Sequence, residues 1–144
     1  MDKRTIGILG LGVFGRSIIN TLRKYNCDII AVDDHEDVIN HFEPILARGV
    51  VGDITDHDLL QAAGIDTCDT VVVATGDNLE SSVLAVMHCK SLGVEKVIAK
   101  VKSKTTREVL LKVGADRCIS PERETGISLA KNILHQATTD VIEL

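Results

Sequence analysis

The chain has 144 residues, of which 44% are hydrophobic, 26% are charged and only 2% are aromatic, and its net charge is −5. This length suits one domain with an aliphatic core, while the acidic balance, the lack of a Lys/Arg-rich run and the scarcity of aromatic side chains argue against nucleic-acid binding. We expect neither a secretory signal nor a membrane span, and four separated cysteines without a Cys-x-x-Cys pair favour reduced thiols over a disulfide framework or a zinc site.

Short β-branched segments alternate along the chain with segments of helical apolar spacing. The expected strands are residues 5–9, 28–32, 49–51, 70–74, 96–101 and 117–119. Two apolar stripes predict helices: the first is Phe14, Ile18, Leu22 and Tyr25, and a later one is Leu79, Val83, Val86 and Met87. Six strands joined by helices predict a Rossmann-like α/β fold with a doubly wound parallel sheet in the order 3-2-1-4-5-6.

Prolines and glycines mark the expected helix ends. Pro44 should end or kink the second helix, and Gly64, Gly93 and Gly114 stand where helices should stop. Ser120-Pro121 should open the last helix, expected over residues 122 to about 137. No strand follows this helix, which favours either a dimerisation element or a chain that is part of something longer.

The glycines at residues 10–15 carry the main functional signal. Gly10-Leu11-Gly12-Val13-Phe14-Gly15 follows the first strand and opens the first helix. In such a loop the first glycine permits a tight turn, the second lets a pyrophosphate approach the backbone, and the third lets the helix pack on the strand. The unpaired N–H groups of the helix then attract phosphate. We therefore predict an adenine-nucleotide site; a purely structural glycine turn is the alternative.

Polar residues at the ends of later strands fit the same site. Asp33 ends the second strand, 18 positions after Gly15, where a carboxylate accepts hydrogen bonds from ribose hydroxyls and repels the 2′-phosphate of NADP. Capping of the next helix by Asp33 and Asp34 is a compatible alternative, and it is favoured for Asp34. Asp53-Ile54-Thr55 and Ala74-Thr75-Gly76 follow the third and fourth strands, beside the topological switch where ligands bind. Ordinary turn and cap chemistry is the alternative for both segments.

The catalytic half of a dehydrogenase is missing from this pattern. A Tyr-x-x-x-Lys pair is absent, because Tyr25 is followed four positions on by Ile29. The five histidines, His35, His41, His57, His88 and His135, are expected to be solvated or to cap helices. We therefore expect a sensor that binds its nucleotide without consuming it. The alternatives are the cofactor half of an NAD-dependent oxidoreductase whose substrate domain lies elsewhere, and an oligomerisation module that binds nothing.

Several segments resemble the nucleotide-binding N-terminal domain of RCK (KTN) proteins, the regulators of Trk/Ktr potassium-uptake systems. They are "IGILGLGVFGRSI", "IIAVDDHEDVI", "VVVATGDNLESSVL", "KVIAKVKS", "LLKVGADRCISPERETG" and the terminal "DVIEL". The resemblance covers essentially the whole chain. It is specific because "GADR…PE…G" is not part of a generic dinucleotide-binding fingerprint.

The resemblance implies roles for individual residues. Residues 10–15 would hold phosphates, Asp33 the ribose, and Asp53 with Ile54 the adenosine end, while Lys100 would face the phosphates as a point charge. Glu122 matches a glutamate that helps bind a divalent cation, Mg²⁺ or Ca²⁺, at a dimer interface; an acidic residue favoured by the helix dipole is the alternative. The candidate cofactor-binding residues are Gly10, Leu11, Gly12, Val13, Phe14, Gly15, Arg16, Asp33, Asp34, Asp53, Ile54, Thr55, Ala74, Thr75, Gly76 and Lys100, and the candidate metal ligand is Glu122.

One position departs from the family pattern. Val13 stands where similar Ktr regulators carry an arginine that senses the terminal phosphate of ATP from the neighbouring subunit. Arg16, one helical turn further on, is either a partial substitute or simply exposed. Both ATP/ADP and NAD/NADH therefore stay open as ligands.

The resemblance also implies an organisation and partners. Residues 1–137 would form the nucleotide-binding domain, and residues 138–144 a linker toward a smaller C-terminal subdomain. The implied partners are a second copy in a homodimer and a membrane potassium-translocating subunit of Trk or Ktr type that the assembly gates; a dimer, a tetramer and an octameric ring stay open as assemblies. We accordingly expect a cytoplasmic regulatory subunit, held at the inner face of the membrane by its partner, that is not an enzyme and does not bind nucleic acid.

Overall fold

The computed structural model describes residues 3–143, with side chains described through residue 136. Within this range the strands are β1 Arg4–Leu9, β2 Cys27–Asp33, β3 Arg48–Val51, β4 Thr70–Val73, β5 Lys96–Lys100 and β6 Arg117–Ile119. The α-helices are α1 Val13–Leu22, α2 Glu36–Phe42, α3 His57–Ala62, α4 Leu79–Ser91, α5 Lys104–Val113 and α6 Pro121–Glu143. Two short 3₁₀ helices, Glu43–Ile45 and Ile65–Thr67, precede β3 and β4.

The six strands form one parallel sheet in the order β3-β2-β1-β4-β5-β6. Leu9, the last residue of β1, pairs with Val32 of β2 and with Val73 of β4. The chain leaves β1 toward β2 on one side and returns to β4 on the other, so the topological switch lies between β1 and β4. The predicted fold class and strand order are confirmed.

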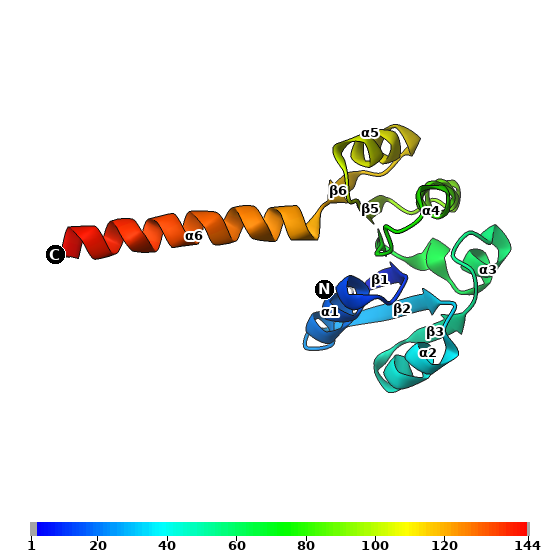
Figure 1. Ribbon diagram of the computed structural model, residues 1–144. Helices are drawn as coiled ribbons and strands as arrows, with labels where there is room; N and C mark the ends of the chain where they lie inside the picture. The colour runs from blue at the N-terminus through cyan, green and yellow to red at the C-terminus, as the bar shows by residue number, and fades with distance from the viewer. Residues whose placement is uncertain (1–2, 144) are drawn as a thin grey trace.

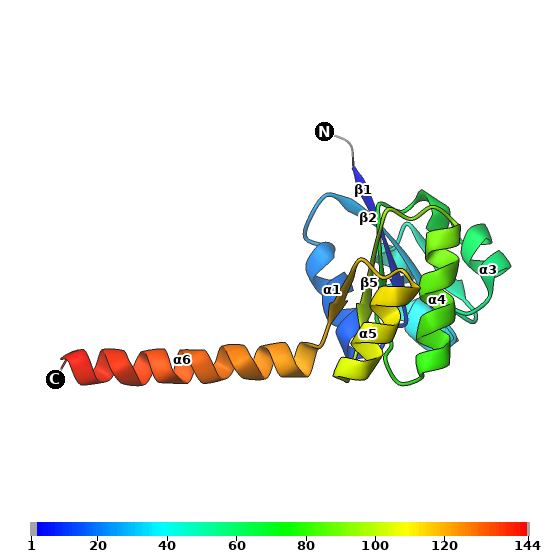
Figure 2. The same ribbon diagram turned by 90° about the horizontal axis from the view of Figure 1, so that it is seen from above.

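Helices cover both faces of the sheet (Figure 1). Side chains alternate along β1, so that Ile8 packs under α1 and α2 while Leu9 packs under α3, α4 and α5. Figure 2 shows α1 on one side of the strands and α3 with α4 on the other. Both layers are aliphatic, which is the composition that a parallel sheet buried on both faces requires.

The helix ends follow the expected breakers. The α2 helix ends at Phe42 and gives way to a 3₁₀ turn containing Pro44. Gly64, Gly93 and Gly114 have positive φ angles of 89°, 87° and 134°, a backbone region that costs glycine little. The long helix begins at Pro121 as expected.

The predicted apolar stripes were partly wrong. Tyr25 lies beyond the end of α1 and is 69% exposed. On α4 the buried residues are Ser82, Ala85, Val86 and Cys89, whereas Leu79 and Met87 are exposed. Small side chains form the buried face of α4, so the larger apolar side chains did not mark it.

Helix α6 extends away from the sheet instead of packing on it (Figures 1 and 2). It runs to Glu143, further than the expected end near residue 137. Its described side chains after Pro121 are exposed and include Ile127, Leu129, Ile133 and Leu134. Across the described residues, no helix combines the length and the hydropathy needed to cross a bilayer.

Candidate functional site

The carboxyl ends of β1, β2, β4 and β5 surround a cleft of about 660 Å³. It is lined by Gly10, Leu11, Gly12, Val13, Arg16, Asp33, Asp34, His35, Val38, Ala74, Thr75, Gly76, Asp77, Lys100 and Glu122. A smaller pocket of about 170 Å³ adjoins it through four shared residues and reaches toward β3. Its lining is Gly10, Asp33, Asp34, Gly52, Asp53, Ile54, Thr75, Asn78 and Ser81. Most of the residues predicted from sequence therefore come together at one edge of the sheet.

The three glycines of the loop differ in what surrounds them. Gly10 has a φ of +94°, and a Cβ there would lie 3.1 Å from the Cβ of Thr75. A Cβ on Gly15 would collide with the carbonyl oxygen of Gly10, so only glycine lets α1 sit so close to the loop. A Cβ on Gly12 would meet nothing within 4 Å. No side chain caps α1, whose N-cap is Gly12, so the helix presents its first N–H groups to this open space.

Asp33 joins the glycine loop to the end of β2. Its side chain is buried; Oδ2 accepts a hydrogen bond of 2.6 Å from the Leu11 N–H, and Oδ1 one of 2.8 Å from the His35 N–H. Burial raises the pKa of this carboxyl, but these hydrogen bonds and the neighbouring His35 lower it more, so the pKa lies below its usual value. Asp33 is therefore an ionised acceptor in the cleft, which is the chemistry that ribose hydroxyls require.

His35 lies between two carboxylates. Its Nδ1 is 3.0 Å from Asp33 Oδ1 and 2.7 Å from Asp34 Oδ1. The hydrogen bond to Asp33 and the negative charge of Asp34 raise the pKa of this imidazole. His35 is the N-cap residue of α2, but its side chain makes no capping hydrogen bond. The expected capping by Asp34 was therefore wrong. His35 lies at a helix cap and is exposed, as expected, but its pairing with two carboxylates was not predicted.

The segment after β3 forms the wall of the smaller pocket. Asp53 Oδ1 accepts hydrogen bonds of 2.8 Å from both the N–H and the hydroxyl of Thr55, and these bonds lower the pKa of the Asp53 carboxyl. Ile54 is buried. The Thr55 carbonyl accepts a hydrogen bond of 2.9 Å from His88 Nε2 on α4. Thr55 thus holds the loop in place, and it does not line either pocket.

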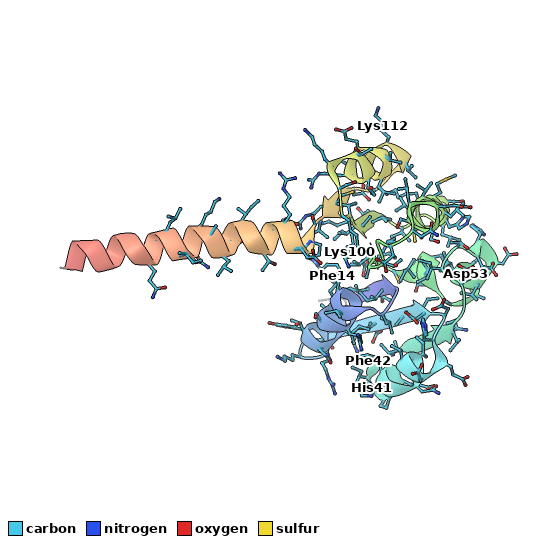
Figure 3. The ribbon with its side chains drawn as sticks, in the orientation of Figure 1. Phe14, His41, Phe42, Asp53, Lys100 and Lys112 are labelled. Atoms are coloured by element: carbon cyan, nitrogen blue, oxygen red, sulfur yellow. The ribbon has the colours of Figure 1, made fainter. Side chains whose placement is uncertain are left out.

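The opposite wall brings cations and an acid to the glycine-loop end of the cleft. Arg16 lies over the glycine loop, where its Nε donates to the Gly12 carbonyl at 3.3 Å. Lys100 lies at the end of β5 with its Nζ 6.0 Å from the ring centre of Phe14, and Figure 3 shows these two side chains together. Glu122, in the first turn of α6, lines the same cleft. A single carboxylate supplies few of the oxygen ligands that Mg²⁺ or Ca²⁺ requires.

Three of the predicted site residues lie outside both pockets. Phe14, Gly15 and Thr55 line neither pocket; Phe14 packs against the core beneath α1 and α2. Sequence reasoning also missed residues that do line the pockets: His35, Val38, Gly52, Asp77, Asn78 and Ser81. The side-chain oxygen of Asn78 caps α4 by accepting a hydrogen bond from the Ser81 N–H. The polar run after Gly76 could have indicated this cap from the sequence.

Comparison with known proteins shows which proteins the chain is similar to. The TrkA-N domain model matches residues 6–121. Ktr system potassium uptake protein C of Bacillus subtilis is 35% identical over 142 residues, which cover 99% of this chain and 64% of that protein. The chain spans 60–65% of the length of three Ktr relatives that it matches.

Solved structures share the fold. The TrkA-N domain of the inner membrane protein ybaL from Escherichia coli superposes with a TM-score of 0.80 at 14% identity, over 91% of this chain and 96% of that one. The GsuK channel bound to NAD gives a TM-score of 0.69 at 24% identity, over 82% of this chain and 21% of that one. GsuK has also been solved bound to ADP.

Proposed function

The chain belongs to the TrkA-N domain family, and we propose that it serves there as a regulatory subunit that binds an adenine nucleotide and gates a separate potassium-translocating membrane protein. The similarity to Ktr potassium uptake proteins supports this role. A subunit of this kind works at the cytoplasmic face of the membrane, where its partner holds it.

One observation carries the nucleotide proposal: the open space at Gly12, the ionised Asp33 and the pocket beside Ile54 form one continuous cleft. In that order they match the phosphates, ribose and adenine of an adenosine diphosphate moiety. ATP/ADP and NAD/NADH share this moiety, and the NAD and ADP complexes of GsuK support the same ligand class. Asp33 and Asp34 disfavour the extra phosphate of NADP, and Val13 leaves the terminal phosphate of ATP without the arginine that similar regulators supply.

We expect the bound nucleotide to act as a signal and not as a reactant. Burial raises the pKa of the Cys68 and Cys89 thiols to about 12, so both stay protonated and are poor nucleophiles. The His35 ring is held by two carboxylates, and the His88 ring by a backbone carbonyl. Hydride transfer would require a substrate and a proton donor placed opposite the cofactor, and the sequence holds no Tyr-x-x-x-Lys pair to supply that donor.

Gating requires an assembly that changes shape with its ligand. The exposed apolar side chains along α6 favour a homodimer. An octameric ring would contain several copies of this dimer. Residues 138–144 would lead toward a smaller C-terminal subdomain. At a dimer interface Glu122 would meet further oxygen ligands and could then help hold Mg²⁺ or Ca²⁺ beside the phosphates. Such a switch requires that a nucleotide bind two dimer geometries with different affinities, a difference that is typically about 1–3 kcal/mol.

Isothermal titration of the chain with ATP, ADP, AMP, NAD and NADH, with and without Mg²⁺ or Ca²⁺, tests the first step. We expect saturable binding of at least one nucleotide, weakened in Asp33→Ala by about 1–3 kcal/mol because charge-assisted bonds to the ribose are lost. Potassium flux through liposomes that hold a Ktr-type membrane subunit then tests gating. Absence of binding by all five nucleotides would overturn the proposal, and consumption of NADH with a carbonyl substrate would replace it with an oxidoreductase.

A further inference from the structure

The acceptor positions on Asp33 are unevenly filled. A carboxylate oxygen accepts about two hydrogen bonds. Oδ2 accepts one, from the Leu11 N–H, whereas Oδ1 accepts from the His35 N–H and also lies 3.0 Å from His35 Nδ1. A ribose with two hydroxyls therefore finds room for one on Oδ2, while the imidazole already occupies the second position on Oδ1.

The His35 ring has an alternative partner within reach. Asp34 Oδ1 lies 2.7 Å from the same Nδ1, and the His35 and Asp34 side chains are 70% and 75% exposed. A carboxylate only accepts, so the Nδ1 that bridges the two acids carries a proton whether the ring is charged or neutral. The ring already contacts Asp34, so when it gives up Asp33 it keeps one of its two carboxylate partners, in an ion pair that is exposed.

We propose that His35 sets the affinity of the ribose subsite: its imidazole competes with a ribose hydroxyl for Asp33 Oδ1 and moves onto Asp34 when a nucleotide binds. This inference rests on the nucleotide binding proposed above. His35 lies outside the glycine-loop fingerprint. Its imidazole and a ribose hydroxyl would compete for the same oxygen of Asp33.

Competition of this kind couples nucleotide binding to protons. The hydrogen bond to Asp33 is the main cause of the raised pKa of His35, so losing it to a ribose lowers that pKa toward its ordinary value. Binding then releases a fraction of a proton, and affinity must rise with pH from the ordinary pKa of about 6.5 upward. The charged ring binds Asp33 more strongly than the neutral ring, so acid favours the competitor.

The surroundings of His35 leave this coupling intact. Asp33 on β2, Asp34 in the following turn and Asp37 on α2 all favour the charged ring. The other ionisable side chains of the cleft are Arg16, Asp77, Lys100 and Glu122, two cations and two anions. Their formal charges cancel, so the three aspartates dominate the field at the imidazole.

Titration of the chain with NAD between pH 6 and pH 8 tests the inference, since the pyrophosphate charge of NAD is constant in this range. We expect Kd to fall about two- to fivefold as pH rises, the effect of one partly exposed ion pair, with proton release visible as a dependence of the heat on buffer ionisation. His35→Gln should flatten the profile, and His35→Ala should also bind more tightly than the unmodified chain at pH 6. His41→Gln, an exposed histidine on the same helix, is the matched control and should keep the slope.

The outcomes separate this inference from the one on which it rests. A slope that survives unchanged in His35→Gln and His35→Ala, with NAD still bound, would overturn the competition alone. Equal affinity of His35→Ala and the unmodified chain at pH 6 would do the same. Failure of every variant to bind NAD at either pH, under conditions where circular dichroism shows them folded, would remove NAD as the ligand and this inference with it. A slope that shrinks with 2′-deoxy-NAD would place the competing hydroxyl on the ribose.

Discussion

Replacing Asp33 by alanine should destabilise the fold as well as the nucleotide site. The substitution removes the acceptor of two backbone N–H groups, those of Leu11 and His35. Leu11 is 3% exposed, so its N–H would be left unpaired in a buried place at a cost of about 1–3 kcal/mol. The His35 N–H can find water, which limits its loss to about 0.5–1 kcal/mol. The free energy of unfolding should fall by about 1.5–4 kcal/mol.

Urea unfolding followed by far-ultraviolet circular dichroism measures this loss, and the absence of tryptophan makes fluorescence a poor choice. With a slope of about 2 kcal/mol per molar urea, the midpoint should fall by about 0.75–2 M. The urea midpoint of Asp33→Asn, which keeps one carbonyl oxygen, should lie between those of Asp33→Ala and the unmodified chain. Asp34→Ala is the control, because its exposed carboxylate pairs only at the surface and should contribute less than about 0.5 kcal/mol. A midpoint for Asp33→Ala equal to that of Asp34→Ala would refute the structural role of the carboxylate.

Three further predictions follow from the loop, the first helix and an acid at the far end of the sheet. Gly15→Ala should destabilise the chain and abolish nucleotide binding, because its Cβ collides with the glycine loop. Gly12→Ala should unfold at nearly the same urea concentration as the unmodified chain and lose only nucleotide affinity in calorimetry. Val13→Arg places a cation at a position that is 77% exposed in the cleft, and should raise the ratio of ATP to ADP affinity about fivefold; an unchanged ratio would mean that the terminal phosphate lies elsewhere. A hydrogen bond from the Val97 N–H lowers the pKa of Asp116. The carboxylate therefore stabilises the fold above its ordinary pKa of about 3.9, and this stability is lost as pH falls through the lowered pKa. Asp116→Asn should make the urea midpoint depend less on pH in the acid range.

The buried face of α4 was in part predicted wrongly from the sequence. The larger apolar residues Leu79 and Met87 lie at helical spacing, yet both are exposed, and the buried face includes Ser82 and Cys89. Ser82 is tolerated there because its hydroxyl donates to the Thr75 carbonyl at 3.3 Å. Hydrophobicity along one helix does not reveal such a partner, which comes from the loop after β4.

The order of strands and the glycine loop were accessible from sequence because both depend on local chemistry. Alternating β-branched and helical segments admit few parallel topologies once crossovers are right-handed. Gly10 has a positive φ, and a Cβ on Gly15 would clash with the loop, so both positions favour glycine. Asp33 was found in the same way, from its distance along the chain. These features recur together in dinucleotide-binding folds of this class, so a pattern of residues is enough to predict them.

Tertiary structure alone decided how the side chains share their partners. Sequence placed Asp33 and His35 two residues apart but could not assign Oδ2 of the carboxylate to Leu11 and Oδ1 to His35, nor bring His88 of α4 to the Thr55 carbonyl 33 residues away. Hydrogen bonds of this kind depend on where separate elements meet, and only the packed sheet sets those positions. The direction of α6 was decided in the same way, because whether a helix folds back or extends depends on which surfaces remain uncovered.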